Sequence, residues 1–165
     1  MQMTIAGLTA ATPSTLPPEV NAVADGVLVN GRALLLAQDP AQPVTLLLQT
    51  TAGNFTRTDI AVADGARRLI VGDLNDDGVP DLAVVSMVYQ AIGEASRVTV
   101  LLQSSTTRAK FGAGTLYIGA PVASFIAAGD LNGDGLNDIV LDDGPSVLRQ
   151  QAASPGLFDP VQPLR

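Results

Sequence analysis

Two near-identical acidic stretches constrain this chain more than any other feature of its sequence. GDLNDDGVPDLAV covers residues 72–84, and GDLNGDGLNDIVL covers residues 129–141. Their first aspartates, Asp73 and Asp130, are 57 residues apart. Internal copies at such a spacing indicate a fold built from successive similar units, and a chain of 165 residues has room for about three of them.

A strand-like pattern recurs along the chain as well. The segment VTLLLQ at 44–49 returns as VTVLLQ at 98–103, and a weaker copy, SVLRQQ, lies at 146–151. A short polar stretch and a phenylalanine follow each copy: Phe55, Phe111 and Phe158. The neighbouring segments are short, rich in Val, Leu, Ile and Thr, and separated by Gly, Pro, Asp and Asn. This composition predicts β-strands rather than helices.

The pattern predicts four strands in each of three units. The expected strands are 19–26, 32–38, 43–49 and 55–62, then 67–74, 81–87, 97–103 and 114–120, then 124–131, 138–143, 146–151 and 158–164. The segment MVYQAIGEAS at 87–96 is expected to be a loop that is longer than its counterparts. Four strands per unit favour an all-β fold of about three four-stranded antiparallel β-propeller blades, which is a partial propeller. The alternative is an all-β sandwich whose hairpins resemble one another by chance.

Composition supports one domain preceded by a lead-in segment. Apolar residues make up 47% of the chain, which is enough for a sizeable core. Residues 1–18 are rich in Ala, Thr and Pro and are expected to be a linker; they lack the basic start of a signal peptide and are interrupted by prolines. The partial propeller is expected over 19–165, with blades at about 19–62, 63–120 and 121–165.

The residue content excludes several classes of function. Because the chain has no Cys and no His, it has no disulfides, thiol nucleophiles, zinc fingers or imidazole acid–base groups. A net charge of −7 with only nine Lys and Arg argues against nucleic-acid binding. No apolar run reaches transmembrane length, so we expect no membrane insertion. No Ser or Thr has an evident base partner and no phosphate-binding loop occurs, so we expect no catalytic residues and no enzyme activity.

In both acidic stretches Asp or Asn recurs at alternate positions. With the first Asp numbered 1, side-chain oxygens at positions 1, 3, 5 and 9 and the backbone carbonyl at 7 converge on one centre. Calcium takes about 6–8 such oxygen ligands, and a glycine at position 6 permits the sharp turn. The predicted ligands are Asp73, Asn75, Asp77, the Val79 carbonyl and Asp81 in the first stretch, and Asp130, Asn132, Asp134, the Leu136 carbonyl and Asp138 in the second. We expect about two Ca²⁺ ions per chain.

Two other interpretations of these stretches fit the sequence less well. An EF-hand or dockerin-like loop begins in the same way, but it needs an acidic ligand at position 12 on an incoming helix. Here position 12 is Val84 or Leu141, within a strand-like run. An Asn/Asp/Gly-rich turn without any metal is the second interpretation, because such turns are common.

The combination of an acid at position 9 and a strand directly after it resembles the FG-GAP or VCBS repeat, the calcium-loop blade of integrin alpha-chain propellers and of many bacterial surface proteins. The resemblance covers residues 63–165 well and 19–62 weakly. In that family the loop joins the innermost strand of a blade to the second strand. The equivalent stretch of the first unit, ADGVLVNGRALLL, offers only Asp25 and Asn30 as polar oxygens, so we expect no calcium there.

The resemblance implies a secreted or cell-surface module that acts in adhesion, scaffolding or protein binding. Its calcium is expected to be structural, because a closed oxygen cage leaves no open position for a substrate. One alternative is a carbohydrate-binding, lectin-like propeller, although two tyrosines and no tryptophan offer it little support. Another is a set of accessory blades in a larger extracellular enzyme. Expected partners are a protein or glycan ligand, together with further blades from a longer chain or from self-association, because propellers have about 4–8 blades.

Overall fold

The computed structural model describes residues 23–29, 32–37, 44–49, 55–62, 66–90, 93–107, 110–120, 123, 125–142 and 144–164. The predicted lead-in at 1–18 lies outside these residues. All regular secondary structure in the described part is β-strand, which confirms the all-β class. In that same part, no helix is long and apolar enough to cross a membrane.

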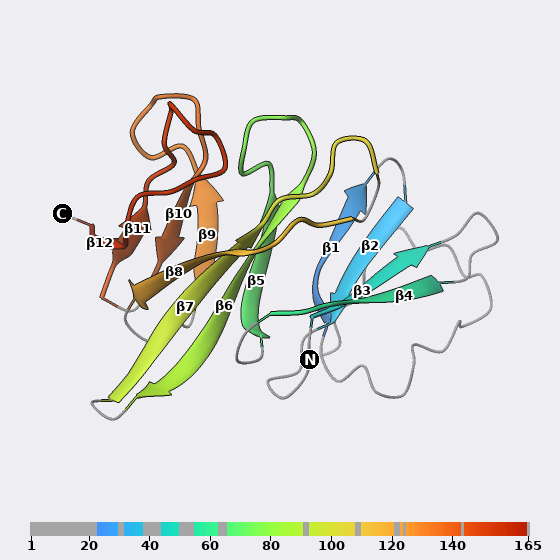
Figure 1. Cartoon of the computed structure of the whole chain (residues 1–165), viewed down its shortest axis with the longest axis horizontal. Coiled ribbons are helices and arrows are strands. Elements are labelled where there is room, and N and C mark those ends of the chain that lie inside the picture. The colour runs from blue at the N-terminus through green and yellow to red at the C-terminus, as the bar shows by residue number, and fades with distance from the viewer. Residues whose placement is uncertain are drawn as a thin grey trace.

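The described residues form three four-stranded antiparallel sheets, and each uses four consecutive strands (Figure 1). The first sheet contains β1 (Val23–Val29), β2 (Arg32–Ala37), β3 (Val44–Gln49) and β4 (Phe55–Ile60); the second contains β5 (Ala66–Gly72), β6 (Asp81–Gln90), β7 (Gly93–Leu101) and β8 (Thr115–Ala120); the third contains β9 (Ile126–Gly129), β10 (Asp138–Leu141), β11 (Ser146–Leu148) and β12 (Gln162–Pro163). Among the described strands, no sheet closes on itself.

Each expected strand overlaps one observed strand, but the expected loop at 87–96 is wrong. Strands β6 and β7 continue through most of it as a hairpin, in which Tyr89 pairs with Glu94 and Gln90 with Gly93. Valine and tyrosine favour an extended ladder, and this preference prevails over the small and polar residues that suggested a loop. The last expected strand is reduced to β12, because Pro160 and the proline in β12 have no N–H to donate to the ladder.

The segment of the first unit that corresponds to the acidic stretch is also not the long loop expected. Asp25 lies within β1, and Val29 at the end of β1 pairs with Arg32 at the start of β2. Only two residues therefore separate these strands, where eight separate β5 from β6. Asn30 lies outside the described residues.

Strand β6 is buried on both faces of the second sheet, and its successive side chains point to opposite sides. One face of β6, with Leu82 and Val84, packs in a core with Val44 and Leu46 of the first sheet. The other face packs in a core with the third sheet. Its members from β6 and β7 are Ala83, Val85, Val98 and Val100, and those from the third sheet include Ile139, Leu141 and Leu148. This double burial explains why DLAVV reads as a continuous apolar run.

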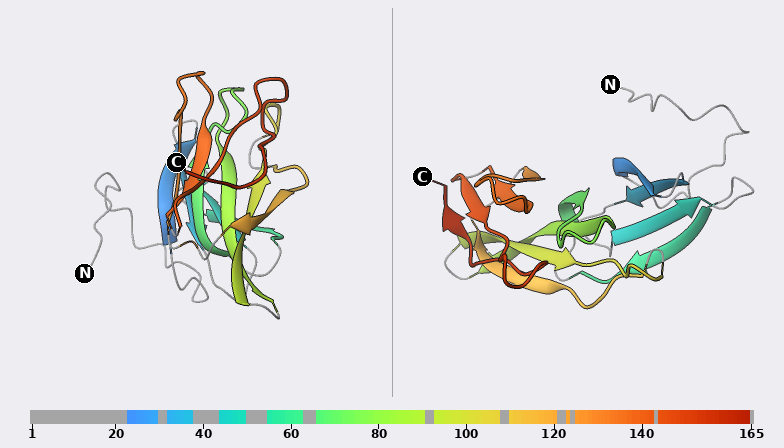
Figure 2. Two further views of the ribbon diagram at one scale, coloured as in Figure 1. Left: turned by 90° about the vertical axis from the view of Figure 1, so that its left-hand side faces the viewer. Right: turned by 90° about the horizontal axis from the view of Figure 1, so that it is seen from above.

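The first strands of the three sheets lie next to one another. Strand β5 contacts both β1 and β9 (Figure 1), and the second sheet stands between the other two (Figure 2). The chain leaves β5 and β9 in the same direction, so the β5–β6 and β9–β10 loops emerge at the same end of the molecule. The fold thus places the two acidic stretches side by side.

The double burial of β6 gives a direct test by substitution. Val84→Ala and Val85→Ala should each lower the free energy of unfolding by about 2 kcal/mol, because each removes two methyl-sized groups from a packed core and leaves a cavity. Ile118→Ala on β8, where the side chain is 54% exposed, serves as the control and should cost less than about 1 kcal/mol. Urea unfolding measures all three. A near-neutral result for either valine would mean that one face of the sheet is solvated.

Candidate metal centres

The ten predicted ligands lie in two loops of the same shape. We call residues 73–81 loop I and residues 130–138 loop II, and number each from 1 to 9. At position 1, Asp73 Oδ2 accepts a hydrogen bond from the N–H of Gly78 at 2.8 Å. Asp130 Oδ2 accepts one from Gly135 at 3.0 Å. Both glycines occupy position 6 with φ of +78° and +86°, a left-handed conformation that side chains disfavour. The sharp turn expected at position 6 is therefore present in both loops.

Positions 3 and 5 form the same pair of local turns in each loop. Asn75 Oδ1 and Asn132 Oδ1 each accept the N–H two residues further on, both at 3.1 Å. Asp77 Oδ1 and Asp134 Oδ1 accept the N–H of position 7 at 2.8 and 2.9 Å. In both loops the Asn side-chain amide also donates to the other oxygen of the Asp at position 5. Such Asx turns fix the conformation of the side chains that carry the predicted oxygen ligands.

Position 9 anchors each loop to the body of its sheet. Asp81 is fully buried; its Oδ1 accepts the N–H of Gln103 at 2.7 Å and its Oδ2 accepts that of Leu74 at 2.9 Å. The Gln103 side chain in turn donates to the carbonyl of Pro80 at 3.1 Å. The start of β6 is thereby clamped to the residues that follow β7.

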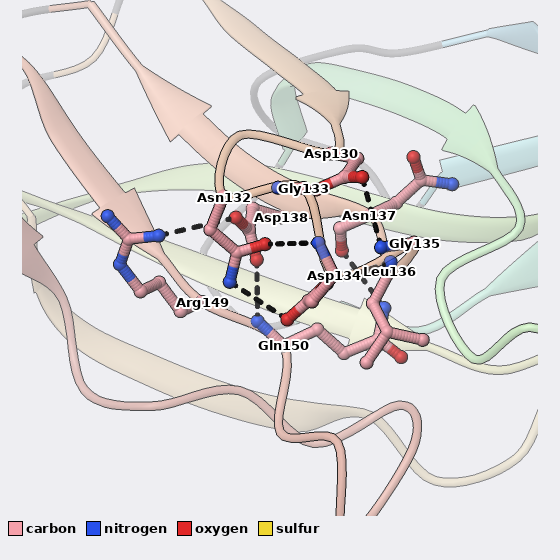
Figure 3. Close-up of polar contacts among 10 residues, drawn as sticks. All are labelled: Asp130, Asn132, Gly133, Asp134, Gly135, Leu136, Asn137, Asp138, Arg149 and Gln150. Atoms are coloured by element: carbon pink, nitrogen blue, oxygen red, sulfur yellow. Dashed lines mark hydrogen bonds and ion pairs between the residues drawn. The ribbon is translucent and has the colours of Figure 1, made fainter.

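Loop II has the same clamp with one difference. Asp138 is also fully buried, and its Oδ1 accepts the N–H of Gln150 at 2.9 Å (Figure 3). The Gln150 side chain donates to the carbonyl of Asn137 at 3.0 Å. Asp138 Oδ2, however, has no hydrogen-bond partner among the described residues, and it forms an ion pair with Nη1 of Arg149 at 3.7 Å.

The two clamping glutamines were missed at the level of sequence. Gln103 ends the copy VTVLLQ and forms a bridge with Phe111, as Gln150 does with Phe158. The recurring Gln–Phe spacing was visible, but it gives no sign that the glutamine contacts an aspartate. The third copy is also shifted by one residue, because Gln150 rather than Gln151 is the equivalent of Gln103.

A single side chain joins the two loops. Asn137, at position 8 of loop II, donates from Nδ2 to the carbonyl oxygen of Asp73 at 2.8 Å. Asp73 is position 1 of loop I, at the point where β5 ends. The two loops are therefore in direct contact, which no spacing in the sequence could reveal.

Burial and neighbouring charge set the acidity of the loops. Burial raises the pKa of Asp81 to about 6, even though hydrogen bonds from Gln103 and Leu74 favour its charged form; the negative charges of Asp77 and Asp73 add to the rise. The pKa of an exposed carboxylate in loop II shifts in the opposite direction. The N–H groups of Gly135 and Gly133 lower the pKa of Asp130.

The donor set fits a hard divalent cation such as calcium. All side-chain donors are oxygens, and a carboxylate oxygen that accepts one N–H keeps a second lone pair for a metal. The bare, buried Oδ2 of Asp138 is an orphaned acceptor of the kind a cation would satisfy. Among the residues that the structure describes, no three acidic side chains are gathered into a ready cluster. The ligand set, including the Val79 and Leu136 carbonyls, stays a prediction.

No protein-family model and no curated protein significantly matches this chain. The chemistry of the two loops therefore carries the functional argument.

The conformation of Gly135 gives the first test of the loop geometry. Gly135→Ala should cost about 1–2 kcal/mol of stability, because the backbone is left-handed there while the added Cβ meets no atom. Gly129→Ala is the matched control: it also has open space, but no positive φ, and should be neutral or slightly stabilising. Thermal melting in chelator compares the two. Equal effects would contradict the role of the backbone conformation.

The pKa of Asp81 predicts how stability depends on pH without metal. Its folded pKa of about 6 lies above the ordinary 3.8, so the folded chain binds more protons between these values. The stability that Asp81 contributes is fully present below about pH 4 and is lost as the pH rises through about 6, by up to about 3 kcal/mol. Urea unfolding in chelator should show this decline.

Asp81→Asn should flatten the decline between about pH 4 and 7 because position 81 then no longer titrates. Asp130→Asn serves as the control: the pKa of Asp130 is lowered, so its contribution is lost only as the pH falls below about 4. A decline that persists unchanged in the Asp81 variant would assign it to another group.

Proposed function

We propose that this chain is a non-enzymatic, calcium-braced β-propeller module of the FG-GAP or VCBS type, which belongs to a secreted or cell-surface protein. In this proposal it acts in adhesion, scaffolding or protein binding. The observation that carries it is the shared hydrogen-bond pattern of loops I and II. In both loops the side-chain oxygens at positions 1, 3 and 5 accept backbone N–H groups of the same loop. A buried Asp at position 9 ties each loop to the glutamine beyond the third strand of its sheet.

The arrangement of the sheets supports the propeller architecture. Three sheets of four consecutive antiparallel strands stand side by side, and their first strands β1, β5 and β9 are neighbours. In a propeller, four-stranded blades are placed in this way around a central axis, with the first strand innermost. Three blades leave the ring open. Further blades from a longer chain or from a second copy would complete it.

The position of the loops supports a bracing role for the metal. Each loop connects the first strand to the second, and its position 9 is bonded to the segment after the third. Bound calcium would supply positive charge that offsets the repulsion among the three or more carboxylates of each loop. The loop residues enclose that charge, and the glutamine clamp transmits the constraint to three of the four strands. An ion enclosed in this way braces a blade and leaves no coordination position for a substrate.

Calcium titration tests the proposal. Chelator-treated protein should bind two Ca²⁺ in calorimetry, with dissociation constants on the order of 10⁻⁴–10⁻³ M or somewhat tighter. Asp77→Ala should remove the site in loop I, and Asp134→Ala should remove the site in loop II, because each deletes an oxygen ligand. Asp76→Asn is the matched control, since it lies in loop I at position 4, outside the predicted ligands, and should keep both sites.

Stability supplies a second readout of the same binding. Calcium at ten times its dissociation constant should add about 1.4 kcal/mol per site to the free energy of unfolding. Magnesium should stabilise less, because it demands compact octahedral geometry. A stoichiometry of zero, or equal stabilisation by both ions, would count against calcium-selective loops.

A further inference from the structure

Loop II contains a buried carboxylate oxygen that lacks a hydrogen-bond donor. Asp138 is 0% exposed, and its Oδ1 is held by the N–H of Gln150, but no hydrogen bond reaches its Oδ2. A buried charged oxygen without a donor is costly, so it needs a compensating positive charge. The guanidinium of Arg149, with Nη1 at 3.7 Å from Oδ2, is the cation that stands there (Figure 3).

In loop I, a hydrogen bond rather than a cation satisfies the equivalent carboxylate oxygen. Asp81 Oδ2 accepts the N–H of Leu74, and the Leu74 side chain is fully buried in the core between the second and third sheets. The equivalent residue in loop II, Leu131, is 47% exposed. Loop II therefore lacks the packing that holds a position-2 N–H against the carboxylate.

A leucine beside loop I occupies the place that Arg149 occupies beside loop II. Leu82 pairs with Leu101 in the second sheet, and Ile139 pairs with Leu148 in the third. The next residues, Leu102 and Arg149, therefore occupy equivalent places beside the position-9 aspartates. The position-9 aspartate of loop I has a leucine beside it, where that of loop II has a permanent positive charge.

We propose that Arg149 acts as a built-in substitute cation that competes with calcium for Asp138, so that loop I fills before loop II. This inference rests on the calcium binding proposed above. A metal at loop II must share Asp138 with the guanidinium or displace it, and the two positive charges repel each other. The Arg149 side chain is 39% exposed, so it has a route into solvent when the metal enters. The equivalent place beside Asp81 holds Leu102, and loop I carries an additional carboxylate, Asp76, where loop II has Gly133.

The consequence is a module with two calcium thresholds. At low calcium, Arg149 neutralises Asp138 and holds loop II in its metal-free form, while loop I binds the ion. At higher calcium the ion takes the place of the guanidinium. The arginine is thus a positioning residue that tunes the affinity of loop II.

Amide NMR resolves the two loops in the full chain. The Gly78 amide reports loop I, and the Gly133 and Gly135 amides report loop II. Titration with calcium chloride should give a dissociation constant about tenfold weaker for loop II, which is about 1.4 kcal/mol. Arg149→Leu, which copies loop I, should tighten loop II by about that factor and leave loop I unchanged. The reciprocal control, Leu102→Arg, should weaken loop I.

Melting in chelator provides the second readout. Arg149→Leu should melt below the parent chain without metal, because Asp138 then loses its ion pair with Arg149, and saturating calcium should recover the difference. Arg149→Gln keeps a polar side chain without the positive charge, and should tighten loop II as well.

Two results would overturn the inference while leaving the proposed function intact: an unchanged loop II constant in both Arg149 variants, or equal tightening of both loops, which would indicate a general effect on stability. If the glycine amide signals of both loops do not shift in millimolar calcium, the proposed function and the inference are overturned together.

Discussion

The hydrogen bond between a buried position-9 carboxylate and the backbone N–H of a glutamine is the interaction on which the rest of the structure depends. Asp81 and Asp138 begin the second strand of their sheets, and Gln103 and Gln150 follow the third. Each bond fixes where a loop ends and where a ladder starts. A carboxylate is costly to bury, and it persists here because donors from distant parts of the chain converge on it. The acidic loops are therefore held by the sheets rather than attached loosely to them.

In the second sheet, one strand supplies both a buried carboxylate and apolar side chains to two cores. Its strand β6 starts with a buried aspartate and continues as an apolar ladder whose alternate residues serve two different cores. Among the described residues, the third sheet packs against another sheet on one face only, and Asp142 stands where the second sheet has Val85. Equivalent positions in the two sheets therefore carry apolar or polar side chains, according to whether another sheet covers them. Local loop geometry is preserved across this change, but the surroundings of the position-9 aspartate are not.

Much of the fold was predictable from local pattern. Alternation, β-branched residues and turn residues located every strand, because those signals act over a few neighbouring residues, and position 6 required glycine for its backbone. The hairpin beyond Met87 escaped prediction because Gly93 and Glu94 interrupt the apolar pattern while the ladder continues. The contacts of Gln150, Asn137 and Arg149 escaped because they depend on which strands become neighbours. Spacing along the chain does not encode that information.

The bond from Asn137 to the Asp73 carbonyl has a consequence for cooperativity. It joins the third sheet to the end of β5 at the same end of the molecule as the loops, in addition to the shared apolar core. Position 8 of loop I is Pro80, whose ring offers no donor for a corresponding bond towards the first sheet. The junctions on the two sides of the middle sheet are therefore unequal. In native-state hydrogen exchange, the second and third sheets would open as one foldon, and the first sheet would separate from them at a lower free energy.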